Sequence, residues 1–208
     1  MMKADDRWRA RPMAATLERP LAPARRRLDV DAYYRMAEAG ILAPDDRVEL
    51  IEGDVIDMVP IGSEHAGQTM RLVRVFAGAV AREQVLLSVQ GPLRLDAINE
   101  PQPDLALLRP RADSYRRSHP SAVDVLLVIE IAGSSLDYDR GVKRDLYARH
   151  LVPEYWIVDL VGRAIEVFRA PTSGGYTETL RVAGGRLRPV LVADTELDVG
   201  ELFGLHGD

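Results

Sequence analysis

The feature that most restricts the fold of this chain is an uninterrupted apolar run, VLLVIEIA, at residues 125–132. A continuous run of aliphatic and β-branched residues is typical of a β-strand buried on both faces, which favours a sheet that is covered on both sides. One residue does not fit that environment, because Glu130 near the end of the run carries a carboxylate. A buried carboxylate is costly unless it is paired or bound to a metal ion, so Glu130 is a candidate site residue.

A second apolar segment, PDLALLR at 103–109, carries an acid at its start, Asp104, directly after a proline. Proline is tolerated at the first position of a strand, where its missing N–H is not needed. If this strand lies beside the 125–132 strand, the carboxylates of Asp104 and Glu130 can converge at one end of the sheet. Two such carboxylates would raise each other's pKa, and a divalent cation would remove that penalty. Oxygen ligands suit Mg²⁺ or Mn²⁺, although each acid could instead pair with an arginine.

A lysine in the next predicted helix is a third candidate. Lys143 lies in DRGVKRDLYARH, residues 139–150, which follows the apolar run after a short loop. Lys143 and Tyr147 are four residues apart and therefore share one face of the helix. A lysine directed back across the strand end would place a cation near a metal-bound water or a scissile phosphate. Asp139, four residues before Lys143, allows a plainer reading as its partner in an ion pair on a solvated face.

Short helices and strands are predicted in the remainder of the chain. The pattern indicates a helix within 28–42, with Asp29 or Asp31 as its N-cap, and a hairpin over 47–60. A long helix is predicted over 63–84, with Ser63 as its N-cap. Its buried face is expected to contain the apolar residues Met70, Val73, Phe76, Ala77 and Val80.

The predicted strands lie mostly in the second half of the chain. They are expected at 85–90, 103–109, 125–132, 154–160, 164–170 and 175–183, with a last short one near 191–194. Combined with the helices, this order predicts a mixed α/β fold, a twisted β-sheet flanked by two main helices.

Composition excludes several classes of protein. The chain has 208 residues, 47% of them hydrophobic, which suggests one domain with a substantial core. It contains no cysteine, so disulfides, thiolate metal sites and cysteine nucleophiles are excluded. No apolar run approaches the roughly 20 residues of a membrane span, and the N-terminus does not resemble a secretory signal. A cytoplasmic protein with no membrane partner is the expectation.

Charge is unevenly distributed along the chain. Residues 1–27 carry eight Lys or Arg against three acids, a net charge of +5. Since the whole chain has a net charge of −5, residues 28–208 have a net charge of −10. We expect residues 1–27 to be a flexible basic arm that could contact nucleic acid, and residues 28–208 to form a single domain. The acidic body argues against nonspecific coating of DNA, but it is compatible with an enzyme that binds metal at clustered acids.

Several separate segments resemble the Uma-two family of restriction endonucleases in the PD-(D/E)XK superfamily. They are DRVELIEGDVIDMVPIGSEH, PDLALL and VLLVIEIAGSSLDYDRGVKRDLYARHLVPEYWIVDL, and the resemblance spans about residues 28–170. It implies a restriction-endonuclease-like core and hydrolysis of phosphodiester bonds with a divalent metal, Mg²⁺ or Mn²⁺.

The resemblance also implies roles for individual residues. Asp104 corresponds to the acid of the "PD" element and Glu130 to the acid of the "(D/E)XK" element, and both would bind metal together with the Ile131 carbonyl. The chain departs from the superfamily pattern at Ala132, where a lysine is usual. The resemblance implies that Lys143 on the following helix has taken over that role.

Two further residues match the family's opening segments. Glu49, in RVELIEG, could hold a metal-bound water or a second metal, or it could be a surface acid at a strand edge. His65, in GSEHAG, matches a histidine at the start of the long helix, and a structural role as the partner of a loop is its plainer reading.

Two other groups of residues could contact nucleic acid. The loop at 110–124 follows the Asp104 strand and could bind phosphates, or it could be an ordinary solvated loop; the basic residues concerned are Arg109, Arg111, Arg116, Arg117 and His119. Tyr155 and Trp156 could stack on a base, although packing on a helix or at a dimer contact is the plainer reading. Alternation along the strand places Trp156 and Val158 on one face.

These observations support three readings of function. The first is a Mg²⁺-dependent endonuclease that cleaves DNA and forms a homodimer. The second is a catalytically weak or inactive module of the same fold that binds nucleic acid or protein. The third is a structural homodimer whose acids pair with arginines.

Overall fold

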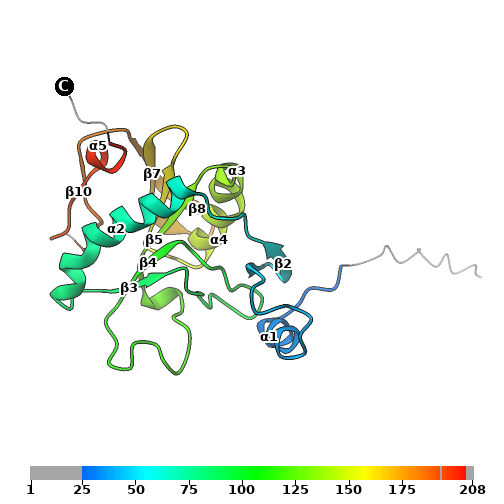
Figure 1. Cartoon of the computed structure of the whole chain (residues 1–208). Coiled ribbons are helices and arrows are strands. Elements are labelled where there is room, and N and C mark those ends of the chain that lie inside the picture. The colour runs from blue at the N-terminus through cyan, green and yellow to red at the C-terminus, as the bar shows by residue number, and fades with distance from the viewer. Residues whose placement is uncertain (1–24, 193, 205–208) are drawn as a thin grey trace, which may run out of the picture.

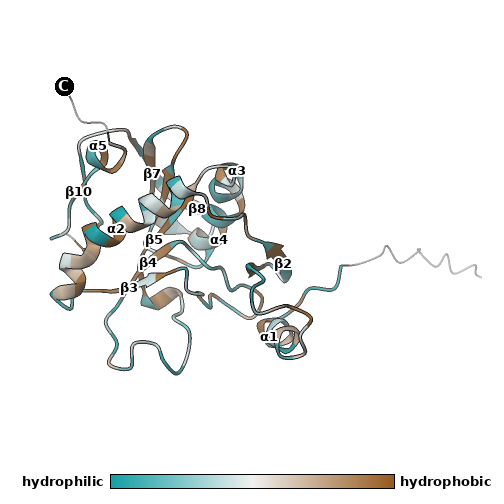
Figure 2. Ribbon diagram, viewed as in Figure 1, coloured by the Kyte–Doolittle hydropathy of each residue, from teal (hydrophilic) through white to brown (hydrophobic). Residues whose placement is uncertain are grey.

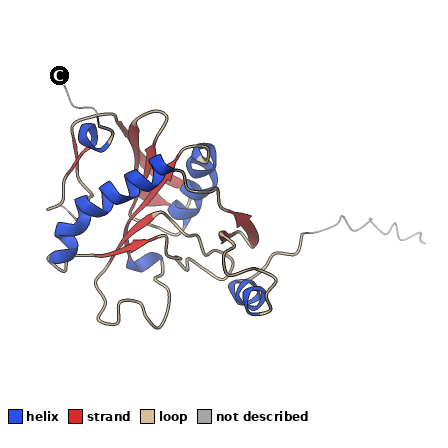
Figure 3. Ribbon diagram, in the orientation of Figure 1, coloured by secondary structure: helices blue, strands red, loops and turns tan. Residues whose placement is uncertain are grey.

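The apolar run forms the central strand β5 (Val125–Ala132), in which all eight residues are buried. The computed structural model describes residues 25–192 and 194–204, and in it β5 lies within a six-stranded sheet ordered β3-β4-β5-β6-β7-β8. The other strands of this sheet are β3 (Leu86–Val89), β4 (Leu105–Leu108), β6 (Glu154–Asp159), β7 (Ala164–Thr172) and β8 (Gly175–Val182). Neighbouring strands are antiparallel except for the parallel pair β5 and β6, so the sheet is mixed, as predicted (Figures 1 and 3).

Helices cover the sheet on both faces. The long helix α2 (Ser63–Ala81) packs on one face, and α4 (Arg144–Arg149) packs on the other, after α3 (Leu136–Tyr138) and a π-helical turn, Asp139–Lys143. Side chains of β4 alternate between the two resulting cores: Leu105 and Leu107 contact the α2 side, and Ala106 and Leu108 the α4 side. In Figure 2, where the ribbon is coloured by hydropathy, β4 and β5 lie at the centre of the molecule, and both are apolar except for Glu130 in β5. This two-sided burial explains why β5 has no polar face.

A separate hairpin, β1 (Val48–Ile51) with β2 (Asp54–Asp57), lies beside the sheet and packs on α1 (Val30–Glu38) (Figure 1). Gly53 at its turn has a φ of 76°, and a Cβ added there would lie 2.6 Å from Cβ of Arg27. The chain before α1 therefore passes directly over the hairpin turn. An antiparallel bridge between Leu50 and Glu100 joins the hairpin to the segment that precedes β4.

The α1 helix begins at one of its two predicted caps. The Asp29 side chain accepts the N–H of Ala32 at 2.7 Å, so Asp29 and not Asp31 is the N-cap. The predicted basic arm lies mostly outside the described residues, which begin at residue 25. Within them, Arg25 pairs with Asp54 on the hairpin at 3.2 Å.

Two predictions for α2 are wrong. Its N-cap is Gly62, and Ser63 is already helical. Its buried residues are Gln68, Leu72, Phe76 and Ala79, whereas Met70 is 68% exposed and Val80 is 37% exposed. Of the predicted face, Phe76 alone is fully buried, Val73 is half-buried and Ala77 is exposed. Apolar residues surround much of this helix, so the 3.6-residue period is compatible with more than one buried face.

The end of the chain also differs from the prediction. Instead of a strand near 191–194, a short strand β10 (Leu197–Asp198) pairs with β9 (Arg186–Leu187) and leads into α5 (Val199–Leu202). Val192 is buried, but it lies in a turn, so its apolar character reflects core contact rather than strand geometry. Among the described helices, none is long and apolar enough to cross a membrane.

Candidate active site

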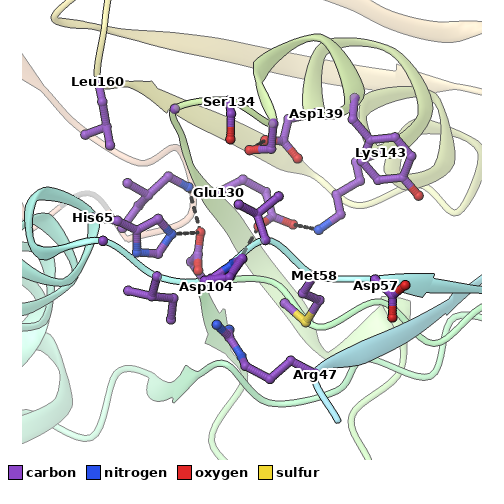
Figure 4. Close-up of a pocket in the computed structure, with 18 of the residues that line it drawn as sticks. Arg47, Asp57, Met58, His65, Asp104, Glu130, Ser134, Asp139, Lys143 and Leu160 are labelled. Atoms are coloured by element: carbon purple, nitrogen blue, oxygen red, sulfur yellow. Dashed lines mark hydrogen bonds and ion pairs between the residues drawn. The ribbon is translucent and has the colours of Figure 1, made fainter.

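A pocket of about 550 Å³ opens where β4 begins and β5 ends. Its walls come from the β1–β2 hairpin with the following loop at 58–62, the first turn of α2, and the segment 133–143 that follows β5. The titratable residues singled out by the resemblance all line it: Glu49, His65, Asp104, Glu130 and Lys143. Figure 4 shows Asp104, Glu130 and Lys143 directed toward one another from three different segments of the chain.

The two strand acids converge at this end of the sheet. Antiparallel pairing places Leu105 of β4 opposite Ile129 of β5, so Asp104 lies beside the next residue, Glu130. The backbone N–H of Asp104 donates to Glu130 Oε2 at 3.3 Å, and Asp104 Oδ2 accepts the N–H of Ile131 at 2.8 Å. His65 Nε2, from the first turn of α2, lies 3.0 Å from the same Oδ2.

Lys143 joins two of the acids. Its Nζ lies 3.0 Å from Glu130 Oε1 and 3.2 Å from Glu49 Oε2, and all three side chains are buried. Tyr147 donates to Glu130 Oε1 at 3.0 Å, which confirms that Lys143 and Tyr147 share a helix face. The plainer reading of Lys143 as the partner of Asp139 is not supported, since Asp139 accepts a hydrogen bond from Ser135 at 2.7 Å instead.

Glu49 is not a surface acid. It is only 2% exposed, on the buried strand β1, and its Oε2 accepts the backbone N–H of Gln102 at 3.1 Å. The β1–β2 hairpin therefore contributes a carboxylate to the wall of the pocket. Among the described residues, Asp104 and Glu130 form no ion pair with an arginine, which removes the main support for the purely structural reading.

The pocket has more negative charge than Lys143 can balance. Burial raises the pKa of Glu130 well above its usual range, and the neighbouring acids add to that effect against the opposing charge of Lys143. Burial also raises the pKa of Asp139 to about 6. For Lys143, burial favours the neutral amine, but the charges of Glu130, Glu49 and Asp139 outweigh it and raise its pKa, so this lysine stays protonated.

The donor atoms suit a small, hard cation. Within the described residues, no three His, Asp or Glu side chains meet as a complete metal cage. Mg²⁺ does not require one, because it usually binds one or two carboxylates and keeps several waters. Asp104 and Glu130 supply two carboxylates, and no hydrogen bond between described residues uses Asp104 Oδ1. The Ile131 N–H faces Asp104, and because the N–H and C=O of a strand residue point to the same edge, its carbonyl faces that side too.

The other predicted contacts with nucleic acid lie elsewhere. The loop at 110–124 leaves the end of β4 opposite to Asp104, and none of its basic residues lines the pocket. Arg111 pairs with Asp113, and His119 contacts Tyr34. Tyr155 and Trp156 are fully buried on opposite faces of the sheet, which confirms the packing reading for both.

Arg47 and Tyr138 are among the pocket residues that were not identified from the sequence. Arg47 precedes β1 and extends toward Asp104 from the hairpin side (Figure 4). Tyr138 lies one turn before Lys143, and its buried hydroxyl has no hydrogen-bond partner among the described residues. Both stand inside segments that carry the family resemblance, and that position was the available signal.

The chain matches one protein family and resembles a solved structure. The sequence profile of the Uma2 family, described as "Putative restriction endonuclease", matches residues 30–200. The fold resembles the crystal structure, at 1.96 Å resolution, of a protein from Anabaena variabilis described as a "putative nuclease belonging to DUF820". The TM-score is 0.68 at 15% identity, covering 85% of this chain and 98% of the other, and the shared fold is restriction-endonuclease-like. Among curated protein sequences, none matches this chain.

Proposed function

This chain belongs to the Uma2 family of restriction-endonuclease-like proteins, and on that premise we propose that it is a metal-dependent endonuclease that hydrolyses phosphodiester bonds in DNA. One observation supports the proposal above the others: Asp104, Glu130 and Lys143 come from three separate segments and meet in one pocket. Several buried carboxylates close together are unfavourable unless a cation offsets their charge, and a bound divalent metal ion would do so.

In the proposed site, Asp104, Glu130 and the Ile131 carbonyl would hold Mg²⁺ or Mn²⁺. When bound, such an ion polarises a phosphoryl oxygen and lowers the pKa of a coordinated water. The two carboxylates then supply geometry rather than acid–base chemistry. Binding of an ion would also compete with Lys143 for Glu130, and the lysine would become available to a substrate.

The protonated state of Lys143 restricts its part in the reaction. Three carboxylates raise its pKa, so it is a poor general base and a good donor of charge and hydrogen bonds. We assign it to the negative charge that develops on the phosphate in the transition state. Glu49 would act as a positioning residue, since its Oε2 lies 3.2 Å from Lys143 Nζ.

The metal site is tested first without catalysis. Isothermal titration of Mn²⁺ into the full chain is expected to show binding that the double variant Asp104→Asn/Glu130→Gln loses. Both substitutions keep the shape of the side chains, and circular dichroism checks that the fold is retained. Equal heats for the two proteins would refute the site. Cleavage of supercoiled, linear and single-stranded DNA, with Lys143→Ala as the inactive control, then tests the reaction.

One observation favours the alternative function, a catalytically weak module of the same fold that binds nucleic acid or protein. Lys143 already pairs with Glu130 and Glu49, which partly balances the acids without any metal. Under this alternative, DNA binding would persist in the Asp104→Asn/Glu130→Gln variant and no cleavage would be detected with the unmodified protein. A homodimer and a cytoplasmic location stay predictions of the sequence.

A further inference from the structure

We propose that the pocket takes one unpaired nucleotide beside the scissile phosphate, so that the substrate is single-stranded or locally unpaired DNA. This inference rests on the proposed nuclease function and deepens it, since it concerns what enters the same pocket. Three independent features of the described residues carry it: the depth of the acids, the apolar rim above them, and the distribution of charge.

The first feature is depth. Asp104 is 7% exposed and Glu130 is 4% exposed, and both line a pocket of about 550 Å³. This volume falls in the range of sites that enclose a small molecule, roughly 300–1,000 Å³. A duplex presents its backbone on a broad, convex cylinder, whereas an unstacked nucleotide can enter a pocket of this size. Enzymes that modify a base in such a pocket act on single strands or turn the nucleotide out of the helix, so a pocket of this kind admits a nucleotide only when it is unpaired.

The second feature is an apolar rim formed by Met58, Val59 and Ile61, in the loop between β2 and α2. Val59 is 56% exposed and Ile61 is 38% exposed, while Leu160 lines the pocket from the end of β6 (Figure 4). A phosphate group is charged and gains no favourable contact from exposed apolar side chains, so the rim would have no function in a site that binds a phosphate alone. In a paired duplex the bases are stacked inside, so a phosphate at the acids would leave this rim against water. An unpaired nucleotide meets both, with its phosphate at the acids and its base or sugar on the rim.

The third feature is charge. With His65 counted as neutral, the formal charges of the residues that line the pocket come from two basic residues, Arg47 and Lys143, and from six acids: Glu49, Asp57, Glu64, Asp104, Glu130 and Asp139. One divalent ion would balance half of this excess of four negative charges. Residues 28–208 as a whole carry −10. Duplex DNA has one charge per about 1.7 Å of axis, a much higher density than a single strand, so an acidic surface of this kind disfavours the duplex more strongly.

The test compares three oligonucleotides of equal length and sequence: a single strand, a fork with unpaired arms, and a blunt matched duplex. Binding to the full chain is measured by fluorescence anisotropy in Ca²⁺, and cleavage in Mn²⁺. We expect the single strand and the fork arms to bind at least tenfold more tightly than the duplex and, where cleavage occurs, to be cut faster by a similar factor. Equal or tighter binding of the blunt duplex would overturn the inference.

A rim variant tests the same idea from the protein side. Val59→Ser/Ile61→Ser should weaken single-strand binding about tenfold and raise KM while kcat changes little, and Val123→Ser, at an exposed position outside the pocket, is the control. Unchanged single-strand affinity in the rim variant would also overturn the inference. The readout in Ca²⁺ needs no cleavage, so an inactive protein that prefers single strands refutes the proposed function and supports the pocket assignment. An active nuclease that prefers the duplex would support the proposed function and refute the assignment of the pocket to an unpaired nucleotide.

Discussion

His65 Nε2 lies 3.0 Å from Oδ2 of Asp104, which joins the first turn of α2 to the residue that precedes β4. The same Oδ2 accepts the N–H of Ile131, so this oxygen is an acceptor and the imidazole hydrogen lies on Nε2. His65 Nδ1 is buried without a hydrogen-bond partner among the described residues. The histidine therefore orients the Asp104 carboxylate through Oδ2, and Oδ1 of Asp104 forms no hydrogen bond with the described residues.

The first prediction concerns this contact. His65→Leu should weaken Mn²⁺ binding by about 10- to 100-fold, because partners that orient a ligand carboxylate typically contribute that much to metal affinity. His65→Gln should retain more of the affinity, since its amide nitrogen can take the place of Nε2, and His65→Asn should not. Calorimetric titration measures all three variants, with His150→Gln, outside the pocket, as the control. Equal affinities for the Leu and Gln variants would show that the hydrogen bond is irrelevant to metal binding.

The second prediction separates charge from metal binding at Lys143. Lys143→Met should lower the cleavage rate by about 10²- to 10³-fold, the usual effect of losing one group that stabilises transition-state charge. It should leave Mn²⁺ affinity unchanged or raise it, because the ion no longer competes with the lysine for Glu130. The metal-free protein should lose about 3–5 kcal/mol of stability, since two buried acids lose their partner.

Arg144→Met is the matched control, because Arg144 is adjacent but pairs with Asp145 at 2.8 Å instead of reaching the pocket. It should cleave at nearly the normal rate. Normal cleavage by Lys143→Met itself would remove the lysine from the proposed mechanism.

The third prediction uses pH. Burial raises the pKa of Asp139 from 3.8 to about 6, so the folded protein holds this proton at pH values where the unfolded chain has released it. Asp139 therefore favours the folded state at low pH, and that contribution is lost as the pH rises from about 4 through 6. Asp139→Asn should gain stability relative to the unmodified, metal-free protein across this window, by up to about 3 kcal/mol.

Urea unfolding between pH 4.5 and 7.5 measures the difference between the two proteins, with the exposed Asp137→Asn as control. A difference that does not change with pH would contradict the assigned pKa. The comparison is made without divalent ions, because bound metal would change the charge that faces Asp139.

The fourth prediction concerns Arg47. Its side chain forms no ion pair with any described residue and lines the pocket beside the acids, which suits a contact with a backbone phosphate. Arg47→Ala should weaken single-strand binding and reduce the slope of log K against log salt by about 0.7, the value for one phosphate contact. Arg163→Ala, at the exposed turn between β6 and β7, should leave the slope unchanged. An unaltered slope for Arg47→Ala would place that side chain outside the binding interface.

Local patterns predicted the parts of the fold that depend on neighbouring residues. The run at 125–132 is a buried strand, one of the two candidate caps, Asp29, caps α1, and Lys143 and Tyr147 share a helix face. Each of these depends on backbone period or on a contact within a few residues. The buried face of α2 was predicted wrongly, because its apolar residues are compatible with several orientations and only the sheet beneath it selects Leu72 and Phe76.

In the candidate site, too, local patterns predicted some residues and not others. The convergence of Asp104 and Glu130 could be predicted from the sequence, because each is an acid in an apolar segment and a buried acid needs a partner. Glu49 and His65 were singled out by the family resemblance alone. Local patterns could not predict the burial of Glu49 or the contact of His65 with Asp104, because a hairpin and a helix turn return to the end of β5 from 81 and 65 residues earlier in the chain.

By itself, the sequence determined where buried strands form and which acids cannot remain alone within them, because apolar period and the cost of burying charge are properties of short segments. The order of the strands, the parallel pairing of β5 with β6, and the approach of Glu49 and His65 to the pocket that holds Asp104, Glu130 and Lys143 were decided only by the tertiary structure. The physical reason is that these contacts join residues far apart in the chain, and packing of the whole sheet against α2 and α4 selects among the arrangements that local preferences allow.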